Sequence, residues 1–187
     1  MAGSCFPVSW RRGNDEHGVA LVLTLMSMVL LLALGGALVT VVATETTIAA
    51  RFRDGLEAFY AADASVAWAM AELRGADWNE VRAGSSKSSL SDGSLDLSAA
   101  TRDLRAIAEA LDWRLYGYGR FKNMVSGAAV DPRLWVVVWV AADPVGDDNL
   151  IVVRSHAYGP AGVRRVVEAT LRQTLDGPRV AGWREGP

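Results

Sequence analysis

Few side chains in this 187-residue sequence are of the types that usually carry catalysis or bind transition metals. The sequence holds one cysteine, Cys5, and two histidines, His17 and His156. A single cysteine cannot form an intramolecular disulfide, and these three residues cannot supply the usual Cys/His zinc spacings. His156 falls within a predicted strand, where we expect a packed or surface residue and no Cys–His or Ser–His–Asp arrangement. We therefore expect no enzyme activity, no cofactor and no structural metal site of this class.

A second group of side chains could bind a hard cation through oxygen atoms. It lies in the segment DPVGDDN and comprises Asp143, Asp147, Asp148 and Asn149. Oxygen ligands from one loop are usual for calcium, but the spacing is not that of an EF-hand, and we favour a plain hairpin turn over a calcium site. The net charge of −2 and pI of about 5.7 do not provide the basic surface of a nucleic-acid-binding module, so no nucleic-acid partner is expected.

The elements that position these groups begin with a long apolar run. No charged residue occurs from Gly18 to Thr44, and the 26 residues Val19–Thr44 would span roughly 39 Å as a helix, more than the roughly 30 Å of a bilayer's hydrocarbon core. A secretory signal peptide has an apolar region of only about 7–15 residues. A chain of this size rarely buries a helix that is apolar all round. The run therefore predicts a membrane-spanning segment, with a buried core helix as the alternative.

The flanking charges do not decide the orientation of this segment. Arg11 and Arg12 precede it, and Arg51 and Arg53 follow it, so the positive-inside rule is balanced. The 17 residues before Gly18 are too few to fold as a domain. We therefore expect them on the cytoplasmic side, with a translocated domain beyond the span.

The apolar pattern continues past the span at helical spacing. Apolar residues recur in steps of three and four, and no proline interrupts the pattern before Gly75, so one helix of about 56 residues is predicted. It divides into a transmembrane half, 19–44, and an amphipathic half, 45–74. The pair Gly35 and Gly36 marks either a place where the helix bends or opens, or a point of close helix packing within a membrane.

A short leader ending in glycine, followed at once by such a helix, resembles the type IV pilins and pseudopilins. More narrowly, it is similar to the PilX-type minor pilins and the K-type pseudopilins of type II secretion. The similar stretch is 17–73, HGVALVLTLMSMVLLLALGGALVTVVATETTIAARFRDGLEAFYAADASVAWAMAEL. It includes the acidic-Thr-Thr segment after the span and the run AFYAADASVAWA, which resembles the family's Phe-x-Ala-Ala-Glu-Ala run. Residues 155–171, SHAYGPAGVRRVVEATL, are similar to the last hairpin of the same proteins.

This resemblance implies processing at the start of the span. Gly18 would be the last residue of a cytoplasmic leader peptide, 1–18, and Val19 the first residue of the mature chain, cut by a prepilin peptidase and N-methylated. Cleavage would remove Cys5. The sequence departs from the family pattern at two positions, because Val19 stands where phenylalanine is usual and Leu23 replaces the glutamate that most major pilins carry at the fifth mature position.

Leu23 bears on the position of the subunit within a fibre. The family's glutamate is thought to neutralise the N-terminal amine of a neighbouring subunit. A carboxylate in an apolar bundle is costly unless it is paired, so a subunit without that neighbour gains from an apolar residue. Leu23 therefore favours a minor, initiating or tip-located pilin, although a plain membrane anchor would also carry leucine there.

The rest of the chain predicts a small domain after a linker. Residues 75–98 contain the serine-rich run GSSKSSLSDGSLDLS and are interpreted as a solvated linker. A second helix is expected over 99–116, ended by Gly117 and Gly119.

Three strands are expected to complete this domain. The run LWVVVWVA, 134–141, suits a strand buried on both faces, 150–158 follows a turn, and 163–175 alternates apolar and polar residues. The predicted fold class is α+β and pilin-like, with the long N-terminal helix packed on a small antiparallel β-meander in a domain spanning 99–175. Residues 176–187 are expected to be a flexible tail.

The predicted function is that of a minor pilin-like subunit of a type IV pilus, which primes assembly or lies at the fibre tip. Its expected partners are other minor and major pilins, a prepilin peptidase, the inner-membrane assembly platform and the lipid bilayer. It would be a single-pass inner-membrane protein with a periplasmic C-terminal domain before it enters the fibre. Roughly 100 residues after the long helix leave no room for the large inserted domain that K-type pseudopilins usually carry, which favours the pilus.

Two alternatives to a pilus subunit stay open. One is a minor pseudopilin of a type II secretion system. The other, of a different class, is a single-pass inner-membrane protein whose periplasmic domain acts as a sensor or scaffold.

Overall fold

The computed structural model describes residues 15–84, 101, 102, 104, 111–125 and 133–186. Its helices are α1 (Asp15–Leu73) and α2 (Trp78–Ala83). Its strands are β1 (Arg114–Arg120), β2 (Trp135–Ala142), β3 (Leu150–Tyr158), β4 (Arg164–Thr174) and β5 (Gly177–Gly186). The chain divides into two compact units, one ending at Ala49 and one beginning at Ala50, and α1 contributes to both.

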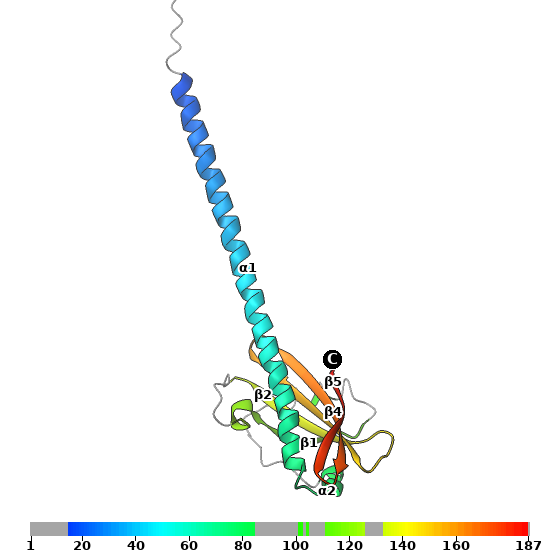
Figure 1. Ribbon diagram of the computed structural model, residues 1–187. Coiled ribbons are helices and arrows are strands. Elements are labelled where there is room, and N and C mark those ends of the chain that lie inside the picture. Colours follow the sequence, from blue (N-terminus) through cyan, green and yellow to red (C-terminus); the bar gives the residue numbers. More distant parts are fainter. Residues whose placement is uncertain (1–14, 85–100, 103, 105–110, 126–132, 187) are drawn as a thin grey trace, which may run out of the picture. The chain divides into compact units, whose positions relative to one another are not determined.

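Helix α1 is a single element of 59 residues without a break (Figure 1). It begins at Asp15, earlier than the predicted start at Val19, and ends at Leu73 just before the glycine that was expected to stop it. Since no proline occurs within α1, no residue removes a donor from its i to i−4 hydrogen bonds. The predicted long helix is therefore confirmed.

The unit that begins at Ala50 is an α+β domain, which confirms the predicted fold class. Its sheet is antiparallel with the strand order β1-β2-β3-β4-β5, so neighbours in sequence are neighbours in space (Figure 1). Strands β2 and β3 pair in unbroken register from Trp135 with Tyr158 to Ala142 with Ile151. Within the part of the chain that the structure describes, the meander has five strands, whereas the sequence pattern predicted three.

The first additional strand corrects the helix that was predicted over 99–116. Residues 101, 102 and 104 are helical, and 105–110 lie outside the described residues. Strand β1, however, starts at Arg114 and runs through both glycines that were expected to end the helix. Its backbone pairs with β2, with a bulge just before Gly117. Over 114–116, pairing with β2 overrides the predicted helix, because local propensity is weaker than the backbone hydrogen bonds and burial that a sheet provides.

The second additional strand corrects the predicted flexible tail. Strand β5 pairs with β4 from Gly177 opposite Thr174 to Gly186 opposite Val166. The two-residue connection, Leu175 and Asp176, leads into Gly177, whose φ of 114° favours glycine. The edge of β4 offers unpaired backbone groups, and a tight hairpin satisfies them.

Part of the predicted linker 75–98 is also structured. The carboxylate of Asp77 caps α2 by accepting the backbone N–H of Asn79 at 2.8 Å. Trp78 and Val81 are buried in the domain core, and this burial is what holds so short a helix. Apart from Gly84, the serine-rich run lies outside the described residues.

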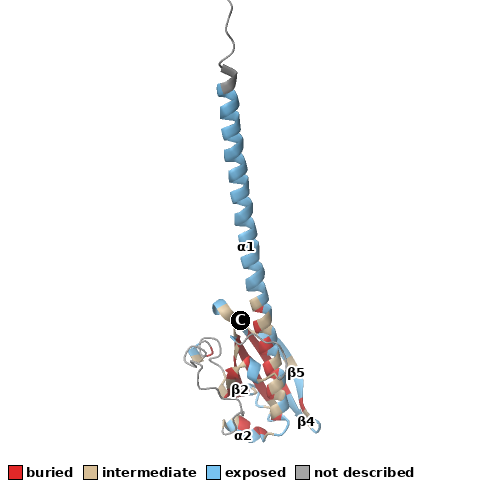
Figure 2. Ribbon diagram, turned by 90° about the vertical axis from the view of Figure 1, so that its left-hand side faces the viewer, coloured by how far each residue is buried: buried red, intermediate tan, exposed pale blue. Residues whose placement is uncertain are grey.

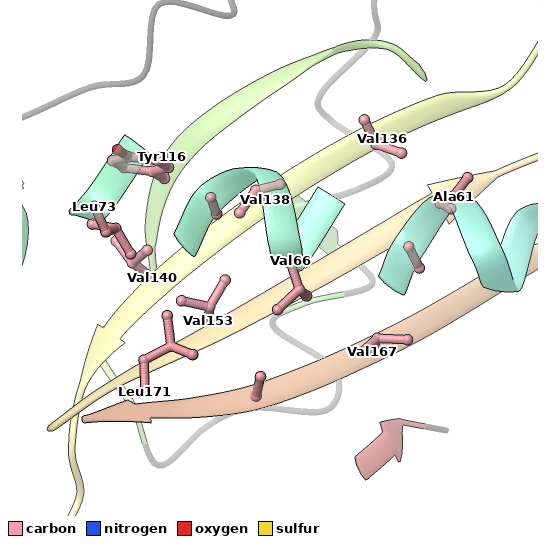
Figure 3. Packing of buried hydrophobic residues seen from close by; sticks show 14 of the residues in the cluster. Ala61, Val66, Leu73, Tyr116, Val136, Val138, Val140, Val153, Val167 and Leu171 are labelled. Carbon is pink, nitrogen blue, oxygen red and sulfur yellow. The ribbon is translucent and has the colours of Figure 1, made fainter. Parts of the chain in front are cut away.

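The core of the domain lies between the sheet and the second half of α1 (Figure 3). The buried positions of α1 recur at steps of one, three and four, and most of them are small: Gly55, Ala58, Ala61, Ala62, Ser65, Val66, Ala69 and Leu73. Small side chains let a helix approach a sheet closely, and the valines and leucines of the strands fill the space between them. Strand β2 is buried on both faces, as predicted, since Val137 and Trp139 belong to a second cluster with Leu104.

Polar contacts also tie α1 to the sheet. The hydroxyl of Ser65 hydrogen-bonds that of Ser155 on β3, and both side chains are fully buried. Near the end of α1, burial together with the neighbouring Glu72 carboxylate raises the pKa of Tyr116 to about 12.

The raised pKa of Tyr116 predicts a loss of stability in alkali. The folded state holds the phenol proton more tightly than the unfolded chain, whose tyrosines titrate near about pH 10. The stability that this difference contributes is therefore fully present below about pH 10. It is lost as the pH rises from about 10 through about 12. The free energy of unfolding should therefore fall less in Tyr116→Phe than in the wild type between about pH 9 and about pH 11.5. Equal losses in the two proteins would contradict this prediction.

Removing the side chain that anchors the end of α1 should be costly. Leu73 is fully buried in the main cluster, so Leu73→Ala is expected to lower the free energy of unfolding by about 2–5 kcal/mol through lost burial and the cavity that is left. Leu175→Ala serves as the control, because Leu175 is fully exposed, and should change stability by less than about 0.5 kcal/mol. Denaturant unfolding of both variants measures the difference, and similar midpoints would count against this packing.

Candidate membrane anchor and assembly site

The first half of α1 exposes a continuous apolar surface. From Val19 to Val42 its large apolar side chains are exposed, and none of its most apolar 18-residue window is buried (Figure 2). The mean hydropathy of that window is 2.5. By length and composition this helix can cross a membrane. The alternative of a buried core helix does not fit the described residues.

The hydroxyl groups of this helix are satisfied within it. Each donates to a backbone carbonyl three or four residues earlier at 2.8–2.9 Å, and the donors are Thr24, Ser27, Thr40, Thr44, Thr46 and Thr47. In a membrane an unsatisfied polar group costs several kcal/mol, so internal pairing lowers the cost of placing these residues in lipid. The polar content of the run is thus compatible with an apolar environment.

The residues predicted to be processed lie near the start of α1. Because the helix begins at Asp15, Gly18 and Val19 lie inside its first turns, and both are exposed. Leu23 is exposed too and lies one turn further along, so it shares a face with Val19. Cleavage after Gly18, methylation of Val19 and an assembly role for Leu23 stay predictions.

The pair Gly35 and Gly36 lies within continuous helix. A side chain added at either position would meet nothing within 4 Å. The hydroxyl of Thr40 donates to the carbonyl of Gly36 at 2.9 Å. Among the described residues none packs against these glycines, so their role in bending or in close packing stays a prediction.

The oxygen-rich segment between β2 and β3 is engaged in its own turn, as the sequence favoured. The Asp143 carboxylate accepts the backbone N–H of Val145 at 3.0 Å, and the Asp147 carboxylate accepts that of Asn149 at 2.9 Å. Asp148 pairs with Arg82 at 2.7 Å. Among the residues that the structure describes, no three Asp, Glu, His or Cys side chains form a group that could hold a metal ion.

His156 belongs to a buried polar cluster on the sheet face opposite α1. Its Nε2 accepts a hydrogen bond from Nε of Arg154 at 3.2 Å, and its Nδ1 lies 3.3 Å from the Tyr158 hydroxyl. Arg154 also donates to Glu168 at 3.1 Å, and the opposite oxygen of Glu168 accepts Nε of Arg184 at 2.9 Å. Burial lowers the pKa of Arg154, and the charge of Glu168 opposes that shift. His156 is thus a packed residue, as predicted.

Sequence reasoning missed this cluster. Arg154, Glu168 and Arg184 lie opposite one another on β3, β4 and β5, so their charges form a ladder across three strands. Two of the three strands were predicted, but the residues of the third, 177–186, were expected to be part of a flexible tail. The ladder becomes visible only once β5 is known to be a strand.

The amphipathic half of α1 also keeps an exposed apolar face. Phe52, Leu56 and Tyr60 follow one another at steps of four and are exposed, in contrast with the buried alanines on the other side of the helix. A groove of about 240 Å³ lies beside Phe52 and Leu56, with Arg165 and Glu185 in its wall. Helical spacing alone could not tell this face from the buried one, because both are apolar.

These observations together describe a pilin-like architecture. A long N-terminal helix starts with an exposed apolar half, and its continuation packs on an antiparallel meander. No protein-family model, no curated protein and no solved structure matches the chain.

Proposed function

We propose that this chain is a minor pilin-like subunit of a type IV pilus, which primes assembly or lies at the fibre tip. The observation that supports this most is the dual nature of α1. One half exposes apolar side chains all round, and the other half of the same unbroken helix buries one face on the sheet. A helix of this kind can be stored in a bilayer and then transferred to the apolar interior of a fibre, since both environments remove its side chains from water.

The proposal implies a sequence of partners. The lipid bilayer of the inner membrane would hold α1, with the domain on the periplasmic side. A prepilin peptidase would cut between Gly18 and Val19, and the inner-membrane assembly platform would pass the subunit to other minor and major pilins. No enzyme activity, cofactor or nucleic acid belongs to this proposal.

Leu23 supports a minor rather than a repeating position. It is exposed on the same face as Val19, where a major subunit of the resembling family would present a carboxylate to a neighbour's amine. A leucine there makes only apolar contacts, which suits a subunit without a charged amine opposite it.

The N-terminus of the protein isolated from its host tests the proposal. Mass spectrometry should find a chain that begins at a methylated Val19 and lacks the 18 preceding residues. A chain that keeps these residues, or that begins at any other position, would contradict the proposal and would favour a membrane protein that stays in place as a sensor or scaffold. Processing would not separate a pilus subunit from a type II pseudopilin, and the neighbouring genes would.

A further inference from the structure

Strand β5 contributes little to the packing of the domain. Neither hydrophobic cluster contains a residue of β5 among the described residues, and Pro178 is its one buried side chain there. The two large apolar side chains of β5, Val180 and Trp183, are each about half exposed, at 51% and 49%. By contrast, β4 buries Val166, Val167 and other residues.

Hollows lie along the length of β5. One of about 290 Å³ is lined by Gly177 and Pro178 at the start of the strand. A second, of about 390 Å³, is lined by Gly182, Trp183 and Arg184 in its later part, and the groove of about 240 Å³ borders Glu185 near its end. At each hollow, β5 lacks packing contacts that a core strand would make.

The side-chain contacts of β5 are few and specific. The indole N–H of Trp183 donates to the Asp63 carboxylate, with 3.1 Å between nitrogen and oxygen. The rings of Trp183 and Phe59 are edge-on to each other, with their centroids 6.1 Å apart. Arg184 pairs with Glu168 through two nitrogens, but its side chain is 71% exposed, so solvent weakens this pair. Glu185 adds an ion pair with Arg165 of β4 at 3.8 Å, and the backbone ladder with β4 contains a bulge between Gly182 and Val180. We expect such a strand to open locally at a lower free energy than the strands beneath α1.

We propose that β5 is a releasable edge strand and that the edge of β4 which it uncovers binds β5 of a second copy of this chain. We expect a second copy to bind at this edge because its β5 carries the residues that the edge already accommodates. Asp63 and Phe59 are positioned to contact Trp183, and Glu168 is positioned to pair with Arg184. Only the same sequence supplies both in register. The hinge is the two-residue connection between β4 and β5, where Leu175 is fully exposed. A strand that leaves can return to its own chain or pair with a second copy, and a high local concentration favours the second copy.

This contact is separate from the helix packing in the proposed function. It joins subunits through their domains and requires neither cleavage after Gly18 nor assembly through α1. A failure of the strand-exchange test would therefore leave the pilin proposal untouched, and incorrect processing at Gly18 would leave strand exchange untouched.

A disulfide across β4 and β5 tests the proposal. A Cβ built at Gly182 lies 3.8 Å from the Cβ of Thr170, which is about the mean Cβ separation in disulfides. The double variant Thr170→Cys with Gly182→Cys is made in a Cys5→Ser background, which holds no other cysteine. The reduced form of the same protein is the matched control, so the two samples differ only in whether β5 can leave.

The probe is a fluorescent synthetic peptide with the sequence of residues 175–186, added to the full chain in detergent micelles. We expect the reduced protein to bind it and the oxidised protein to bind it on the order of tenfold less or not at all. A peptide in which alanine replaces Trp183 and Arg184 should bind the reduced protein more weakly than the parent peptide. Equal binding to the oxidised and reduced proteins, or no binding to either, would overturn the proposal.

Hydrogen exchange provides a second readout that needs no peptide. In the reduced protein the backbone amides of β5 that pair with β4 should exchange on the order of tenfold or more faster than those of β3, and oxidation should slow them. Exchange of β5 and β3 at one common rate would show that β5 opens only when the whole domain unfolds, and would also overturn the proposal.

Discussion

A Gly18→Asp variant is expected to accumulate as the uncleaved chain and to be absent from fibres. The resemblance to pilins makes Gly18 the residue before the scissile bond, and a carboxylate there would place a bulky charge in a peptidase site that accepts glycine. Gly18 lies in exposed helix with nothing within 4 Å of an added Cβ. The substitution therefore has no neighbouring packing to disturb, and its effect should be confined to processing.

Intact-mass measurement and fractionation of sheared fibres follow this effect. Gly35→Ala is the matched control, because it also changes an exposed glycine of α1 that has no neighbour within 4 Å, and we expect it to be cut normally. Processing and assembly of Gly18→Asp at the wild-type level would contradict the prediction. Loss of processing in both variants would point to a general defect of the helix.

Glu168→Gln is expected to cause a large loss of stability. Glu168 accepts hydrogen bonds from Arg154 and Arg184, and the Arg154 side chain is only 4% exposed. Removing the carboxylate charge leaves a buried guanidinium that is in contact with His156 and with the face of Trp113 at 5.9 Å, and that is influenced by the like charges of Arg184 and Arg164. Removing one partner of a buried pair typically costs about 3–5 kcal/mol, and we expect a loss of this order in denaturant unfolding.

A second ion pair in the same domain provides the control. Arg165 and Glu185 lie 3.8 Å apart, and both side chains are about half exposed. Glu185→Gln should therefore change the free energy of unfolding by less than about 1 kcal/mol. The double variant Arg154→Met with Glu168→Leu should recover much of the loss, because it removes both charges instead of stranding one. Equal effects of Glu168→Gln and Glu185→Gln would show that burial does not govern the contribution of Glu168.

The confirmed predictions depend on local patterns. A run without charges, joined to apolar residues at steps of three and four and free of proline, predicts a long helix whatever surrounds it. Likewise the valine-rich run that became β2 predicts a strand covered on both faces. The buried and exposed faces of the amphipathic half were not separable, because Phe52 and Leu56 are as apolar as the residues that α1 buries.

The predictions that were wrong concern the two edge strands of the sheet. Residues 114–116 were assigned to a helix and 177–186 to a tail, yet both form edge strands of the sheet. An edge strand buries few side chains and so carries a weak apolar pattern, while its backbone pairing depends on a neighbouring strand that lies elsewhere in the sequence. For the same reason the ladder of Arg154, Glu168 and Arg184 could not be foreseen.

The sequence by itself determined the apolar half of α1, its continuation as one helix and the α+β class, because hydrophobic periodicity acts over neighbouring residues. Only the tertiary structure decided which face of the helix meets the sheet, how many strands the meander has and which charges are buried. Those features depend on contacts between segments far apart in the chain, such as Ser65 with Ser155 and Trp183 with Asp63. Their free energy arises only when the fold brings these partners together.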